Sequence, residues 1–173
     1  MSVASVADRP GASPIRRNFG RRKFDKQPTQ AAKVLIAAPY GDPIPPSAVK
    51  RAVSLSDGGP VAVITIARIY GSSMGLPNPG LMPTRKEMAA QKEQVEKAIR
   101  MVERSGIQAW GQLAASRKPV KTIAEAARAR GAEHVVLVRT PQKKKWRELV
   151  EGDIVKEVSR KLGSGVVVEG VTP

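Results

Sequence analysis

The sequence predicts an α/β domain built on a five-stranded, doubly wound parallel sheet, preceded by a basic arm that is disordered or extended. Two observations carry this prediction. From Lys33 onward, short and nearly unbroken apolar runs alternate with amphipathic stretches, which is the pattern of parallel strands that helices cover on both faces. The chain has 173 residues, enough for one domain with a sizeable core plus an extension. We therefore divide it into an arm, residues 1–31, and an α/β domain, residues 32–173.

The first three elements of the domain are two buried strands and the helix between them. Residues 34–38 and 61–69 are apolar and partly β-branched, so we expect strands that are covered on both faces. Residues 47–56 repeat apolar side chains at helical spacing. Two prolines suit the start of this helix, and two glycines suit its end.

A long loop separates the second strand from the second helix. Residues 70–84 are rich in glycine and proline, and loops of this length in compact domains are usually functional or mobile. The helix is predicted over residues 84–105, with Thr84 and Glu87 as a capping box and Gly106 as its end.

The second half of the domain continues the alternation of strands and helices. The alternating pattern of the third strand indicates a less buried, edge position, and Gly131 marks the end of the third helix. The five remaining elements are predicted in the order strand, helix, strand, helix, strand over residues 107–114, 120–130, 134–139, 146–162 and 166–169.

The net charge of the chain indicates which kinds of partner it favours. Lysine and arginine total 30 against 15 acidic residues, which gives a net charge of +15. Such a charge favours phosphate-rich surfaces, with nucleic acid ahead of anionic membranes. No apolar run approaches the roughly 18 residues of a membrane span, and the first residues do not have the pattern of a secretory signal. We expect a cytoplasmic protein that does not bind membranes.

The sequence offers little for catalysis or for metals. Cysteine is absent, so there is no disulfide and no thiolate ligand or nucleophile. The only histidine, His134, stands at a predicted strand start, and no metal-ligand spacing is present. We therefore expect no enzyme activity, no catalytic residues, no metal and no cofactor.

The arm combines cationic and aromatic side chains. Seven basic residues oppose two acidic ones, and both phenylalanines of the chain lie here. Cations neutralise phosphates and aromatic rings stack on unpaired bases, so this composition suits RNA. The alternative is a solubilising or purely electrostatic tail. The RNA-contacting candidates are Arg16, Arg17, Phe19, Arg21, Arg22, Lys23, Phe24 and Lys26.

A second basic cluster follows the fourth strand. In an open α/β sheet, ligands bind at the carboxyl ends of the strands, so the turn that leaves this strand is a candidate site. The simpler alternatives are a solvated loop for the lysines and packing on the sheet for the tryptophan. The candidates for RNA contact are Arg139, Lys143, Lys144, Lys145, Trp146 and Arg147.

The order and spacing of these elements resemble the universal stress protein family. The resemblance covers about residues 33–169 and rests on KVLIAA as the first strand, VAVITI as the second, and TIAEAARARGAEHVVLV as the third helix and fourth strand. It implies the strand order 3-2-1-4-5. The topological switch point then lies between residues 39–42 and 139–153.

Nucleotide-binding members of that family carry an aspartate after strand one and a loop of the form Gly, two residues, Gly, nine residues, Gly, then Ser or Thr. Pro39 takes the place of the aspartate, with Asp42 nearby. Arg139 and Gln142 take the first two glycine positions, and Asp153 takes the hydroxyl position. Of the glycines only Gly152 is retained, and Pro141 removes a backbone donor. The remaining cofactor-binding candidates are Asp42 and Gly152.

Two main hypotheses follow. The first is a non-enzymatic, stress-related binding protein that attaches to structured RNA, with the ribosome and its proteins as the favoured target. The second is a nucleotide-binding, dimeric universal stress protein with an incidental basic tail, in which the fifth strand pairs across a homodimer as the resemblance implies. An adaptor for acidic proteins or membrane surfaces is a third.

Overall fold

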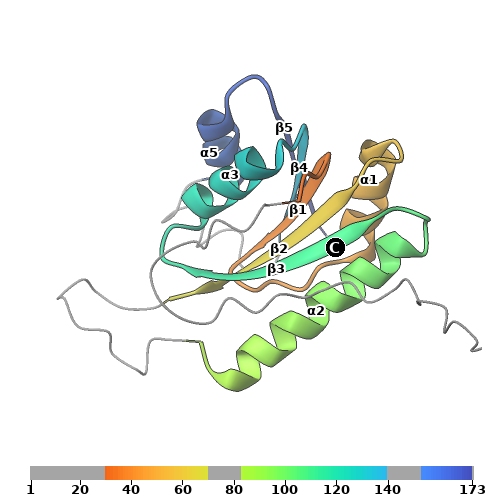
Figure 1. The fold of residues 1–173 in the computed structure, drawn as a ribbon. Coiled ribbons are helices and arrows are strands. Elements are labelled where there is room, and N and C mark those ends of the chain that lie inside the picture. The colour runs from red at the N-terminus through yellow and green to blue at the C-terminus, as the bar shows by residue number, and fades with distance from the viewer. Residues whose placement is uncertain (1–29, 70–82, 140–152, 173) are drawn as a thin grey trace, which may run out of the picture.

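The computed structural model describes residues 30–69, 83–139 and 153–172 (Figure 1). The predictions made for the arm, for the loop of residues 70–82 and for residues 140–152 lie outside these ranges. Within the described residues, no helix has the length and apolar character that crossing a bilayer requires.

The described part of the chain forms a five-stranded parallel sheet in the order β3-β2-β1-β4-β5, which confirms the predicted fold class and strand order. The strands are β1 (Val34–Pro39), β2 (Val61–Arg68), β3 (Ala109–Ser116), β4 (His134–Val138) and β5 (Val167–Val171). The helices are α1 (Pro46–Ser56), α2 (Arg85–Glu103), α3 (Pro119–Arg130) and α5 (Ile154–Leu162).

The core has two halves, one on each face of the sheet. Helices α1 and α2 cover one face, and α3 and α5 cover the other (Figure 1). Because side chains alternate along a strand, the central strand β1 supplies both halves. Val34 and Ile36 pack in the half below α1 and α2, whereas Leu35 and Ala37 pack in the half below α3 and α5. Every residue of β1 is buried, as the unbroken apolar run predicted.

The helix ends follow the local sequence signals. The Thr84 hydroxyl accepts a hydrogen bond from the Glu87 N–H (3.2 Å), and the Glu87 carboxylate accepts one from the Thr84 N–H (2.7 Å), which confirms the capping box. The hydrogen bonds that the Thr84 N–H and the Thr84 hydroxyl (2.9 Å) donate to the Glu87 carboxylate lower the pKa of Glu87. Helix α3 ends at Gly131 in the left-handed conformation (φ 63°), where glycine has no steric penalty.

Some predicted boundaries are wrong. The third strand runs from Ala109 to Ser116, two residues later than predicted at each end, although Ile107 before it is buried. Helix α5 begins at Ile154, because Asp153 has an extended backbone and caps the helix with its own side chain. The predicted helix of residues 146–162 is therefore wrong in passing through Asp153 without a break, and its predicted start lies outside the described residues. The edge position predicted for the third strand is confirmed, since among the described strands β3 pairs only with β2.

A polar clasp joins α1 to the last strand, β5. The Arg51 guanidinium donates two hydrogen bonds to the Glu169 carboxylate, at 2.7 and 2.8 Å, and the Ser47 hydroxyl donates one to the carbonyl of Thr172 (3.2 Å). The bond from Arg51 lowers the pKa of Glu169. The clasp attaches the carboxyl end of β5 to α1, while parallel pairing holds β5 beside β4.

The contact between β3 and α2 leaves no room at Gly111, so this position offers a test of the packing. A Cβ there would lie 2.2 Å from Val95 Cγ1 and 2.8 Å from Ile99 Cδ1. Gly111→Ala should therefore lower the free energy of unfolding by about 1–3 kcal/mol, measured by urea denaturation. Gly165→Ala is the control, since a Cβ there meets nothing within 4 Å. Equal effects at the two positions would contradict the packing described.

Candidate functional site

The carboxyl ends of β1 and β4 form the topological switch point of the sheet. The two strands are neighbours, and after them the chain continues to opposite faces: β1 leads to α1, and β4 leads towards α5 (Figure 1). Since Ala37 is in register with Leu137, Pro39 comes level with Arg139. A crevice at such a point is where open parallel sheets bind ligands.

A tight turn leaves β1 at this switch point. Tyr40 and Gly41 both have positive φ (65° and 69°), and the Asp42 N–H donates to the Pro39 carbonyl (3.4 Å), as in a type I′ turn. The turn lies under α2, because a Cβ on Gly41 would be 2.4 Å from Gln91 Nε2. Asp42, one of the predicted cofactor-binding candidates, is 8% exposed and so lies within the turn and not on its surface.

Arg139 lies on the β4 side of the switch point. Its N–H donates to the carbonyl of Val171 (2.8 Å), which extends the pairing of β4 with β5 by one residue. Its side chain crosses Gly170, where a Cβ would lie 2.6 Å from Arg139 Cδ. The guanidinium reaches the Asp153 carboxylate at 3.9 Å, and about a quarter of the Arg139 side chain is exposed.

Asp153 already occupies the N-terminal end of α5. Its Oδ1 accepts a hydrogen bond from the Val155 N–H (3.1 Å) and is the same oxygen that faces Arg139. The partial positive charge of a helix N-terminus is therefore met by the protein's own carboxylate. A phosphate at α5 would encounter that negative charge before it reached a backbone amide.

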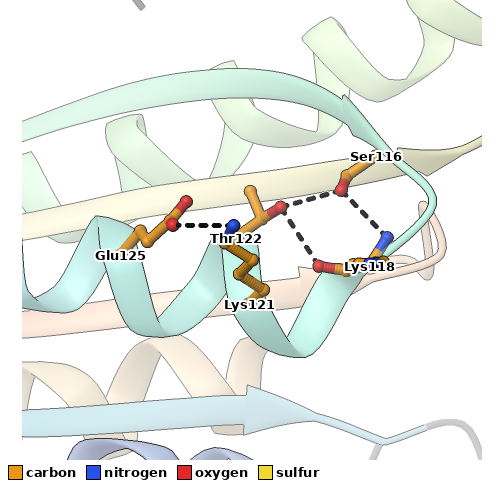
Figure 2. A network of polar contacts seen from close by, with 5 residues as sticks. All are labelled: Ser116, Lys118, Lys121, Thr122 and Glu125. Carbon is orange, nitrogen blue, oxygen red and sulfur yellow. Dashed lines mark hydrogen bonds and ion pairs between the residues drawn. The ribbon is translucent and has the colours of Figure 1, made fainter.

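A second concave region lies at the same edge of the sheet, between β3 and the first turn of α3 (Figure 2). The Ser116 hydroxyl accepts a hydrogen bond from the Lys118 N–H (3.0 Å), and the Thr122 hydroxyl lies 2.8 Å from it. This cleft has a volume of about 480 Å³. Its lining residues are Ile69, Ala114, Ala115, Ser116, Arg117, Lys118, Lys121, Thr122 and Glu125.

Sequence reasoning assigned no function to this cleft. The available signal was the Arg117-Lys118-Pro119 sequence, which follows a strand directly and so falls at the carboxyl edge of the sheet. The signal is weak, because basic residues next to a helix start are common on solvated surfaces.

Of the predicted site residues, the structure places Asp42 and Arg139 on the two sides of the switch point. In the described ranges, no three His, Asp or Glu side chains come together as metal ligands would. The remaining predicted residues lie outside the described residues; they are Arg16, Arg17, Phe19, Arg21, Arg22, Lys23, Phe24, Lys26, Lys143, Lys144, Lys145, Trp146, Arg147 and Gly152.

The strand order and the switch point define an open, doubly wound α/β domain. Comparison with solved structures then identifies the fold as that of universal stress proteins, which confirms the resemblance at the level of the fold. No protein-family model and no curated protein matches the sequence.

The solved structures are similar over almost their whole length. A universal stress protein from Archaeoglobus fulgidus in complex with dAMP has 17% identity and a TM-score of 0.53, over 82% of this chain and 98% of that one. A universal stress protein from the same organism has 19% identity and a TM-score of 0.56, over 79% and 97%. A universal stress protein in complex with cAMP has 16% identity and a TM-score of 0.55, over 83% and 98%.

The two roles of Asp153, helix cap and ion-pair partner, can be separated by substitution. Asp153→Asn keeps a capping side chain, whereas Asp153→Ala removes it, so only the alanine variant should lose about 1 kcal/mol of unfolding free energy in urea denaturation. Equal losses in both variants would show that the ion pair with Arg139, and not the cap, stabilises this end of α5.

Proposed function

We propose that the chain is a non-enzymatic binding protein for an adenine nucleotide, with the ligand in the crevice between β1 and β4. The observation that carries the proposal is the switch point itself, with Arg139 level with the turn of residues 39–42. Similar solved structures, whose fold this chain shares, are complexes with dAMP and with cAMP. Adenine nucleotides are therefore the first ligands to consider.

The phosphate would be met by a side chain and not by a glycine-rich loop. A guanidinium can hold a phosphate through two parallel hydrogen bonds. One partner of Arg139 is the Asp153 carboxylate, at 3.9 Å and about one-third exposed. That separation is too long for a hydrogen bond, so a dianionic phosphate that accepts two hydrogen bonds can replace the carboxylate as a partner of Arg139.

The opposite side of the crevice supplies a hydrogen-bond acceptor. Gln91 Oε1 is buried against the turn after β1 and has no hydrogen-bond partner in the described part of the structure. A buried acceptor without a partner costs about 1–3 kcal/mol. An amino or hydroxyl group of a nucleoside would offset that loss, provided that the side chain shifts to receive it.

Calorimetric titration with AMP at fixed ionic strength tests this proposal. Arg139→Gln should weaken binding about tenfold, the loss of roughly one charge-assisted contact. Asp153→Asn should tighten binding, because it removes a competing charge and keeps the helix cap. Arg104→Gln, an exposed substitution with the same charge change at the C-cap of α2, is the control and should have no effect. Equal affinities in all four proteins would overturn the switch point as the site.

RNA attachment is a second candidate function, and the distribution of charge supports it. The described residues carry 19 basic and 11 acidic side chains, a net charge of +8 over 117 residues. The other 56 residues carry +7, which is nearly twice the charge per residue. A polyanion such as ribosomal RNA, with or without ribosomal proteins, would be drawn to the arm and to residues 143–147.

Co-sedimentation with ribosomes at low and high salt tests the RNA candidate. The full chain should pellet with ribosomes at low salt and release as salt rises, because neutralised phosphates release counterions. A chain that begins at Ala31 should lose most of the association, and substitution of the three lysines at 143–145 by glutamine should weaken it further. Association that depends on neither the arm nor salt would contradict RNA attachment.

A further inference from the structure

We infer that the cleft between β3 and α3 is a second ligand site, which binds a small phosphorylated molecule with an apolar body. The cleft is separate from the switch point, because β2 and β1 lie between β3 and β4 in the sheet. Ligand binding in this cleft can therefore be tested independently of nucleotide binding beside Arg139.

The dimensions of the cleft suit a small molecule. Its volume of about 480 Å³ is within the range of roughly 300–1,000 Å³ that is usual for ligand pockets. Ile69, Ala114 and Ala115 give it a small apolar lining. Alanine side chains at the end of β3 leave space that larger residues would fill, so the apolar part of a ligand has a surface to contact.

The polar side of the cleft carries an excess of positive charge. Arg117 and Lys118 are exposed, and neither has an ion-pair partner among the described residues. The third cation, Lys121, pairs with Glu125 at 3.7 Å (Figure 2), but both side chains are at least half exposed and the pair is therefore weak. Three cations and one carboxylate leave a local net charge of +2, which a phosphate dianion would balance.

The backbone around this charge is held in place. Ser116 accepts a hydrogen bond from the Lys118 N–H, and the Thr122 hydroxyl lies within hydrogen-bonding distance of both Ser116 Oγ (2.8 Å) and the Lys118 carbonyl (3.2 Å) (Figure 2). The first turn of α3 contains no acidic residue, in contrast to α5 with Asp153 at its cap. An anion at α3 therefore meets no carboxylate cap like that of α5, and the one nearby acid, Glu125, already pairs with Lys121.

The test is an NMR titration of the full ¹⁵N-labelled chain with AMP, inorganic phosphate and adenosine, each at constant ionic strength. AMP should shift the amides of residues 116–122 in a saturable manner, phosphate should do so more weakly, and adenosine should not. The double substitution Lys118→Gln and Lys121→Gln should weaken AMP binding at these amides at least about tenfold. Shifts at residues 39–42 and 139 report the switch point separately.

The control is the double substitution Lys92→Gln and Lys97→Gln on α2. It makes the same change in net charge. It also removes an i,i+4 ion pair, that of Lys92 with Glu96 (3.4 Å), just as the test variant removes the pair of Lys121 with Glu125. Retained binding in this control supports the site. The inference is overturned if both double variants weaken binding equally, if no saturable shift occurs at residues 116–122, or if only an RNA oligonucleotide produces the shifts.

Discussion

The structure depends on the burial of β1 on both faces. A central parallel strand must be apolar at every position, so consecutive residues such as Leu35 and Ile36 belong to opposite halves of the core. Helices must then cover both faces, which requires the chain to leave β1 and β4 towards opposite sides. The crevice at the switch point is a consequence of that requirement. The site is thus positioned by hydrophobic burial, and its chemistry is supplied by the residues that follow each strand.

Those residues give two of the helix starts at the carboxyl ends of the strands, those of α3 and α5, different electrostatic character. At α5, Asp153 caps the helix and faces Arg139, so the protein satisfies its own charges. At α3, Ser116 holds the loop through a neutral hydroxyl, and Arg117 and Lys118 carry no ion pair within the described residues. Both ends lie at the carboxyl ends of the strands. The residues at each end, and not the fold, determine whether a carboxylate already occupies the helix start.

Local patterns were sufficient to predict most of the fold. The apolar runs of β1 and β2, the Thr84–Glu87 capping box and the stop at Gly131 are each determined by neighbouring residues, and each is found where expected. The start of α5 was missed, because helical periodicity continues through residues 146–162 and one hydrogen bond to Val155 decides the boundary. The cleft was missed for a different reason: its lining comes from three separate elements, and only the tertiary structure brings them together.

Because Arg117, Lys118 and Lys121 are exposed, their charges alone give a ligand only weak affinity. An exposed ion pair contributes about 0–1 kcal/mol, so three of them supply at most about 3 kcal/mol. That is less than the roughly 4.1 kcal/mol of a millimolar dissociation constant. Phosphate alone is consequently held weakly in the α3 cleft, and useful affinity requires apolar contact as well. The lining of Ile69, Ala114 and Ala115 provides such contact at α3, where burial of about 100 Å² of apolar ligand surface adds about 2.5 kcal/mol. A polyanion such as RNA gains a comparable binding free energy through many phosphate contacts. Small-molecule binding and RNA binding therefore differ in their dependence on salt.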